Sequence, residues 1–347
     1  MKTVKVRNGK KKDDDKFLKE NILSAGSDLL DLTTGYFPTG VMNIVGDSSS
    51  GKSFLSGEII ANSFHQFKNF SWFYDDAEKG YKFDSQILYG IDILKDGLLK
   101  EDAVSETIED FEKNIHWVIN KKNKEDIFIY VLDSFEKLSS REEELFMEKN
   151  RNKEKKDGTY GMGKASFFNQ FCRNYVKKLV ENKILLIITS QLRNKIGIFF
   201  GSPYTRQCEK ALNFYSNIVL FMKETEKYKK FNRTYGICVG ITTKKARHRK
   251  PFRSCYLDFL FDYGIDNIRS NLKFLFDLKT ETGKDKEKKD KKNLIWKEKE
   301  FSSLEKLIHY IYINDLEQEL KEEVTEKWNS IEEKVLEESL IGRKRKW

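Results

Sequence analysis

Residues 46–53 read GDSSSGKS and match the pattern G-x-x-x-x-G-K-[ST] at every defined position. The run GVMNIV before them is apolar enough for a buried strand, and SFLSGEIIANSF after them suits a helix. A glycine-rich loop at the start of a helix presents unpaired main-chain N–H groups to a phosphate. A chance match in a serine-rich turn is the alternative, but the strand–loop–helix context favours a nucleotide-binding loop. Its residues are Gly46, Asp47, Ser48, Ser49, Ser50, Gly51, Lys52, Ser53 and Phe54.

Each defined position of this loop has a chemical reason. Gly46 and Gly51 let the backbone turn tightly around a phosphate. Lys52 supplies positive charge to the β- and γ-phosphates, and the Ser53 hydroxyl is a ligand for Mg²⁺. The motif therefore predicts ATP and Mg²⁺ as cofactors.

Short apolar runs recur through the middle of the chain. Five of them read as strands that are covered on both faces, at 69–76, 126–134, 184–190, 217–223 and 235–243. Between the first two, apolar residues recur at spacings of three and four, which predicts a helix with one buried face; they are Val104, Ile108, Phe111, Ile115 and Ile119. This alternation predicts an α/β fold with a mostly parallel central sheet and helices on both sides.

Composition divides the chain into four parts. Residues 1–25 are rich in charge and are expected to form a basic arm, with a candidate subunit-tethering helix over 15–26. Residues 26–275 hold the strand and helix signals of the core. Residues 276–300 read as a charged linker, because the stretch KTETGKDKEKKDKKN at 279–293 contains almost nothing to bury. Residues 301–347 carry a helical apolar stripe and end in the basic tail GRKRKW.

Several protein classes do not fit this composition. No apolar run approaches the roughly 20 residues that a membrane helix needs, and the first residues lack the apolar segment of a secretory signal. The four cysteines are widely spaced, which predicts reduced thiols in a cytoplasmic protein and no structural zinc. The net charge of +9 favours a polyanionic partner, although a lysine-rich genome would produce the same balance.

Two carboxylates follow predicted strands. Asp133 ends the run IFIYVLDS, where the second half of a phosphate-loop site holds Mg²⁺ together with Ser53. A helix N-cap is the alternative for Asp133. Glu78 follows the run FYDD, and a carboxylate beside the loop could polarise an attacking water. A solvated side chain at a strand end is the alternative there.

Four stretches resemble the RecA recombinases. The segment 190–216, SQLRNKIGIFFGSPYTRQCEKALNFYS, resembles their second DNA-binding loop. The segment 242–266 has a basic pair, then Pro-Phe, then a strand that ends in a glycine turn, as RecA has. DAE at 76–78 and LDS at 132–134 match the two acidic motifs. The resemblance covers residues 23–270, and the size, lysine content and divergent ends look like a phage recombinase of the RecA/UvsX group.

The resemblance implies a catalytic set of Lys52, Glu78, Gln191, Lys245 and Arg247. Glu78 would activate the hydrolytic water, and Gln191 would sense the γ-phosphate. Lys245 and Arg247 would reach the ATP of a neighbouring subunit and neutralise the charge that develops there. ATP would then lie between the subunits of a homo-oligomeric helical filament.

The resemblance also implies a set of DNA-binding residues. Arg173 on a helix after a loosely similar first loop is a candidate phosphate contact, and the second loop supplies the remaining contacts. The full set is Arg173, Arg193, Lys195, Gly197, Phe199, Phe200, Gly201 and Arg206. Cys208 and Glu209 depart from two glycines of the family, and KGYKFDSQ lacks a counterpart of the adenine-stacking tyrosine.

Together these features predict an ATP-dependent strand-exchange recombinase that forms filaments on single-stranded DNA and also binds double-stranded DNA. It would act in recombination, repair and replication of phage DNA in the cytoplasm of a bacterial host. Single-strand-binding and loader proteins are candidate partners, and no membrane is expected. A hexameric helicase or motor on the same core is one alternative. A nucleotide-binding mediator without turnover is the other.

Overall fold

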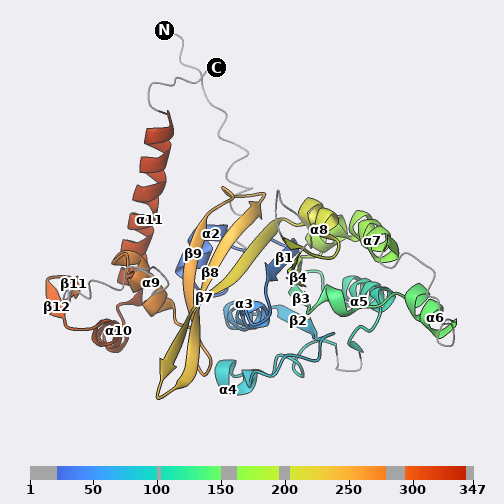
Figure 1. The fold of residues 1–347 in the computed structure, drawn as a ribbon, viewed down its shortest axis with the longest axis horizontal. Coiled ribbons are helices and arrows are strands. Elements are labelled where there is room, and N and C mark those ends of the chain that lie inside the picture. The colour runs from blue at the N-terminus through green and yellow to red at the C-terminus, as the bar shows by residue number, and fades with distance from the viewer. Residues whose placement is uncertain (1–21, 100–102, 150–161, 195–203, 279–293, 341–347) are drawn as a thin grey trace, which may run out of the picture.

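One eight-stranded sheet occupies the middle of the molecule, with helices on both sides (Figure 1). The computed structural model describes residues 22–99, 103–149, 162–194, 204–278 and 294–340. The strands of the sheet are β1 (Gly40–Gly46), β2 (Phe70–Asp75), β3 (Ile127–Leu132), β4 (Ile184–Gln191), β7 (Ile218–Lys230), β8 (Arg233–Ala246), β9 (Ser254–Leu260) and β10 (Gly264–Ile265). Their order across the sheet is β10-β9-β8-β7-β1-β4-β3-β2.

The sheet is parallel on one side and antiparallel on the other. β1 pairs in parallel with β4 and β7, and β3 pairs in parallel with β2 and β4. From β7 to β10 each neighbour is antiparallel. The predicted α/β class with a mostly parallel sheet is confirmed. The prediction did not include the pairing of β7 with β8, which form a long antiparallel hairpin from the two runs predicted at 217–223 and 235–243.

Helices cover both faces of the sheet. They are α2 (Asp28–Thr34), α3 (Lys52–Gln66), α4 (Ser85–Tyr89), α5 (Ile108–Lys121), α6 (Arg141–Lys149), α7 (Met162–Glu181), α8 (Glu209–Tyr215), α9 (Asn267–Leu275), α10 (Leu304–Ile313) and α11 (Glu317–Leu340). Strand β3 shows why two layers form, because its side chains alternate between faces. Ile129 joins the apolar cluster that includes α3, whereas Tyr130 joins the cluster that includes α5 and α7.

Short segments on both sides of the predicted core pack into the apolar cluster on the α3 side, through Leu23 and Trp296. Leu23 forms an antiparallel bridge with Phe37 and is fully buried, so the end of the helix predicted over 15–26 is extended. Residues 1–21 lie outside the described residues. After the gap at 279–293, β11 (Leu294–Trp296) and β12 (Lys299–Phe301) form a hairpin, and Trp296 is buried in the α3-side cluster. Residues 294–300 of the predicted linker are therefore part of the folded structure.

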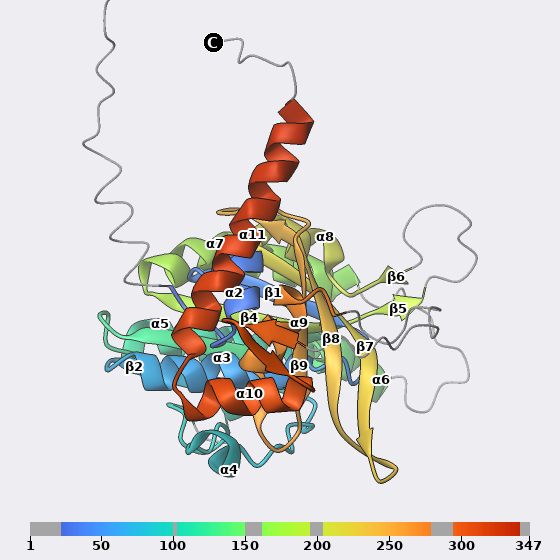
Figure 2. The same ribbon diagram turned by 90° about the vertical axis from the view of Figure 1, so that its left-hand side faces the viewer.

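The last helix, α11, leaves the body of the molecule. Leu320 and Val324 in its first half are buried in the α3-side cluster. Its second half extends away from the sheet (Figure 2). None of the helices in the described ranges is long and apolar enough to cross a lipid bilayer.

The α5 side of the sheet depends on aromatic packing around Phe111. This residue is fully buried, and its ring centroid lies 4.8 Å from that of Phe171 and 5.6 Å from that of Tyr130. We expect Phe111→Ala to lower the free energy of unfolding by about 3–5 kcal/mol, because it leaves a cavity in a packed core. Urea unfolding measures this change. Ile87→Ala, whose side chain is 79% exposed, is the control and should change stability little.

Candidate nucleotide-binding site

The loop between β1 and α3 has a backbone that requires glycine. Gly51 has a φ of 88°, in the left-handed region, and a Cβ placed on it would lie 2.7 Å from the ring of Phe259. A Cβ on Gly46 would lie 2.4 Å from the Ser50 hydroxyl and 2.6 Å from the main-chain oxygen of Met222. The two glycines therefore keep open a cradle of main-chain N–H groups at the start of α3, as the motif predicts.

Lys52 lies folded into this cradle. Its ammonium donates to the main-chain oxygens of Gly46 at 3.1 Å and Asp47 at 2.8 Å. Burial lowers its pKa, and the carboxylates of Asp133 and Glu78 oppose that shift. The buried hydroxyl of Ser50 has no hydrogen-bond partner among the described residues. A buried ammonium held only by neutral oxygens, beside an unpaired hydroxyl, fits the phosphates of a nucleotide.

Asp133 lies directly after β3 and joins three parts of the structure. Its carboxylate accepts hydrogen bonds from Ser53 at 2.5 Å, Tyr74 at 2.6 Å and Thr189 at 2.6 Å. These donors belong to α3, β2 and β4. The structure thus places the two predicted metal ligands, Ser53 and Asp133, in direct contact. A hydroxyl and a carboxylate are oxygen donors of the kind that Mg²⁺ uses beside nucleotide phosphates.

Glu78 lies beside Asp133. Its main-chain N–H donates to the main-chain oxygen of Asp133 at 3.0 Å, and the Ser134 hydroxyl donates to its carboxylate. Asp76 fixes the turn that follows, because its carboxylate accepts from the main-chain N–H groups of Gly80 and Tyr81, both at 3.0 Å. Glu78 is thereby held half-buried beside Asp133, and its charge acts on the Lys52 ammonium together with that of Asp133.

Gln191 ends β4 at the level of the loop. It is opposite Gly46 in the parallel pairing of β1 and β4, and it is half-buried. Lys52, Glu78, Asp133 and Gln191 therefore follow four neighbouring strands at one edge of the sheet. The carboxyl ends of parallel strands meet at the same edge, and this edge is where α/β sheets bind ligands.

A cavity of about 500 Å³ opens beside the loop. Gly51, Lys52 and Ser53 line one side, and the rings of Phe83 and Phe261 line another. Aromatic walls next to a phosphate cradle suit the flat base of a nucleotide. The sequence did not predict this part of the site, because the segment KGYKFDSQ has no counterpart of the adenine-stacking tyrosine. The phenylalanine of that segment was the available signal.

Phe54, predicted as part of the loop, packs against the aromatic residues that line the cavity. It is buried, and its ring centroid lies 5.2 Å from that of Phe83 and 5.1 Å from that of Phe259. Its role is thus to pack the aromatic wall, while the more exposed Phe83 and Phe261 are accessible to a ligand.

The basic pair Lys245 and Arg247 lies elsewhere. Because β8 runs antiparallel to β7, its carboxyl end lies toward the amino end of β1, away from the loop. The Lys245 ammonium donates to the main-chain oxygens of Asn213 at 2.5 Å and Phe214 at 2.9 Å, and Arg247 donates to that of Phe214 at 2.5 Å. The structure therefore does not bring these two residues to the nucleotide-binding loop of their own chain.

The predicted DNA-binding residues fall into two groups. Lys195, Gly197, Phe199, Phe200 and Gly201 lie outside the described residues. The main chain of Arg193 belongs to β5 (Arg193–Asn194), which pairs with β6 (Tyr204–Thr205) and closes the base of that loop. Arg173 is exposed on α7, as a phosphate contact would require.

Arg206 does not fit its predicted DNA contact. Only 1% of its side chain is exposed, and its guanidinium donates to Asn213 at 2.6 Å and lies 3.7 Å from the Glu209 carboxylate. It also lies over the ring of Phe221. Glu209, which stands where the related family has glycine, supplies a partner that keeps Arg206 inside the protein. Its side chain packs the start of α8 instead of facing solvent.

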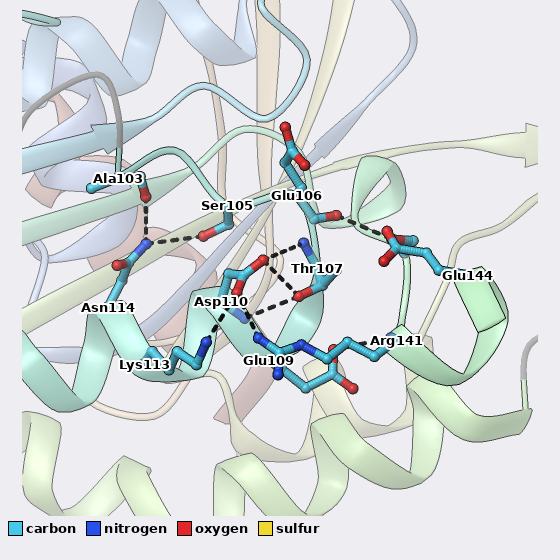
Figure 3. A network of polar contacts seen from close by, with 11 residues as sticks. Ala103, Ser105, Glu106, Thr107, Glu109, Asp110, Lys113, Asn114, Arg141 and Glu144 are labelled. Atoms are coloured by element: carbon cyan, nitrogen blue, oxygen red, sulfur yellow. Dashed lines mark hydrogen bonds and ion pairs between the residues drawn. The ribbon is translucent and has the colours of Figure 1, made fainter.

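The segment that leads toward the predicted first DNA loop is anchored by polar contacts. Asp110 accepts from Thr107 in a capping box at the start of α5, and Arg141 at the start of α6 donates to it at 3.2 Å (Figure 3). Asn114 donates to Ser105, which in turn donates to the buried carboxylate of Asp75 at 2.6 Å. The start of α6 is therefore tied, through α5, to the end of β2.

A substitution in the loop tests whether its shape matters for binding. We expect Gly51→Ala to weaken binding of a fluorescent ATP analogue at least tenfold, because its Cβ would displace Phe259 and distort the cradle. Gly90→Ala is the matched control: Gly90 has a φ of 76°, and nothing lies within 4 Å of its added Cβ. Both changes should cost roughly 1–2 kcal/mol of stability through left-handed backbone strain. Equal binding by the two variants would contradict this interpretation.

A buried carboxyl beneath α3 predicts a pH dependence. Glu58 Oε1 accepts from the Tyr89 hydroxyl at 3.1 Å and the Ile265 main-chain N–H at 3.0 Å, and burial raises its pKa to about 7. The unfolded chain releases this proton at lower pH, so wild type should lose roughly 2–3 kcal/mol of stability as pH rises from 4.5 to 7. Glu58→Gln should lack this loss, which urea unfolding at pH 5 and pH 8 measures. Parallel stability curves for the two proteins would refute it.

Comparison with known proteins agrees with this site. The family model of the RecA N-terminal domain matches residues 6–266. Protein RecA of Arthrospira platensis is 30% identical over 269 residues, 77% of this chain and 68% of the relative. Protein RecA of Trichodesmium erythraeum is 28% identical over 254 residues, 72% of this chain and 66% of the relative. The chain thus spans about two thirds of the length of these curated relatives.

A crystal structure of the RadB recombinase aligns with 70% of this chain over 98% of the RadB chain, with 15% sequence identity and a TM-score of 0.47. The family match extends over the nucleotide-binding loop, both acidic motifs and the strand that ends in Gln191. This chain belongs to the RecA family.

Proposed function

We propose that this protein is an ATP-dependent recombinase that assembles as a helical filament on single-stranded DNA and exchanges its strand with a duplex. The observation that carries the proposal is the meeting of Lys52, Glu78, Asp133 and Gln191 at one edge of the sheet in a chain of the RecA family. A phage recombinase of the RecA/UvsX group, acting in a bacterial host, is the biological setting that we infer.

The side chains of the site have separate tasks in hydrolysis. The Lys52 ammonium exchanges the main-chain oxygens of Gly46 and Asp47 for phosphate oxygens. Asp133 and Ser53 would hold Mg²⁺, which would supply positive charge to the phosphates. The Glu78 carboxylate, oriented by the Ser134 hydroxyl, accepts a hydrogen bond from the attacking water. Gln191, next to the loop on β4, donates to the γ-phosphate and transmits its presence to the DNA-binding loop that follows.

The neighbouring subunit completes the site. Lys245 and Arg247 lie at the opposite end of the strands from the nucleotide-binding loop of their own chain, and both are at least partly exposed. In a head-to-tail assembly they would approach the nucleotide of the next subunit and stabilise the charge of the transition state. They would release the main-chain oxygens at the end of α8, which follows the DNA-binding loop. Single-strand-binding and loader proteins are the accessory partners that such a filament would use.

Two substitutions separate binding from hydrolysis. Lys52→Ala should abolish ATP binding and DNA-stimulated hydrolysis. Glu78→Gln should keep ATP binding and lower hydrolysis at least about a hundredfold, because only the water contact is lost. Phosphate release is measured with and without single-stranded DNA and Mg²⁺. Lys79→Ala, an exposed neighbour, is the control.

Hydrolysis by the wild-type protein that does not respond to single-stranded DNA would overturn the recombinase proposal. Negative-stain images with DNA and a slowly hydrolysed ATP analogue test the assembly. Open helices are expected, and closed rings would point to a hexameric motor. Background turnover under all conditions would point to a mediator without turnover.

A further inference from the structure

The turn between β8 and β9, residues 247–253, is held by the C-terminal helix. Together with α2 and α11 it lines a cavity of about 650 Å³. Three main-chain contacts anchor the turn to the sheet. The N–H of Arg247 donates to the oxygen of Asn217 at 3.0 Å, that of Phe252 donates to the oxygen of Thr243 at 2.6 Å, and that of Thr243 donates to the oxygen of Arg253 at 2.9 Å. The His248 ring contacts the main-chain oxygen of Gly35 at 3.1 Å.

This turn concentrates positive charge. Five residues that line the cavity are basic: Arg247, His248, Arg249, Lys250 and Arg253. Among the described residues, Glu332 of α11 is the one acidic side chain that lines it. Four permanent cations around one cavity repel one another, so a carboxylate in their midst has a large effect on how they are arranged.

Glu332 binds two of these cations at once. Arg253 donates to both oxygens of its carboxylate, from Nε and, at 2.7 Å, from a terminal nitrogen. Lys250 donates to the same carboxylate at 2.9 Å. These contacts lower the pKa of Glu332 to about 2. A bidentate pair between arginine and carboxylate is a geometrically specific interaction, unlike a single exposed ion pair.

Among the described residues, Glu332 is also the last one at which α11 is tied to the body of the protein. Earlier in the helix, Lys321 pairs with Asp28 at 2.9 Å, and Lys327 pairs with Asp277 at 2.7 Å. Beyond Glu332 the described part of the helix is exposed, including the apolar side chain of Val335. The helix therefore has its own attachment near its start, and Glu332 adds a link between its free half and the turn.

We propose that Glu332 is a positioning residue, which fixes the turn 247–253 against α11 and so sets the direction in which Arg247 projects. The position of the C-terminal helix then controls how the basic pair meets the neighbouring subunit. The part of this inference that concerns ATP rests on the proposed function. The link between α11 and the turn does not.

The experiment uses the full-length protein with Glu332→Gln, and Glu333→Gln as the matched control, because Glu333 is the adjacent exposed residue. Hydrogen exchange is followed at the amides of Arg247 and Phe252 without ATP or DNA. Loss of the link should speed their exchange about two- to fivefold in the first variant only. Arg253→Gln should have the same effect, and the double variant should not exceed it. Unchanged exchange in Glu332→Gln would overturn the link.

A second readout tests positioning. Glu332→Gln should lower the turnover of DNA-stimulated ATP hydrolysis, while a fluorescent ATP analogue should bind the isolated subunit as tightly as in wild type. Faster exchange with normal turnover would overturn the positioning role. Absence of DNA-stimulated hydrolysis in the wild type would instead contradict the proposed function, and the exchange result would still decide whether Glu332 holds the turn.

Discussion

The carboxylate of Asp133 is the interaction on which the site depends. It takes hydrogen bonds from three hydroxyls, on β2, β4 and α3, at the point where the sheet ends. A buried carboxylate is costly unless such donors surround it. Because the donors come from separate elements, the same group that would hold the metal also fixes the start of α3 against two strands. The carboxylate of Asp133 thus places the loop and the two predicted metal ligands, and its main-chain oxygen holds Glu78 beside them.

The two halves of the sheet have different tasks. The parallel half brings the ends of β1, β2, β3 and β4 together and so builds the phosphate side of the site. The antiparallel half carries Phe261 to the cavity beside the loop and Lys245 to the opposite side of the molecule. One sheet therefore carries the candidate nucleotide-binding surface at one end of its strands. At the opposite end it carries the residues proposed to act on the next nucleotide.

Much of the fold and of the phosphate side could be predicted from the sequence. The loop has a dense local pattern, and Asp133 and Gln191 end strongly apolar strands, which fixes their side of the sheet. Phe83 lies in a segment that the sequence singles out, but its pairing with Phe261 in one aromatic wall could not be predicted, because the two residues come from segments that are adjacent only in the folded chain. Arg206 looked available for DNA, but its burial depends on Glu209 and Asn213. The docking of α11 depends likewise on distant ion pairs, which no local pattern reports.

Strand β8 has a geometric consequence for any assembly of this protein. Thr234 near its start lines the cavity beside the loop, and Lys245 lies near its end. At about 3.3 Å per residue, the strand between them spans at most roughly 35 Å, because β-bulges interrupt its pairing with β7 and bend it. A paired strand does not stretch, so in the proposed filament β8 would hold the distance between one nucleotide and the next nearly constant. Changes in the pitch of a filament would then come from rotation of whole subunits, with the distance along β8 held constant.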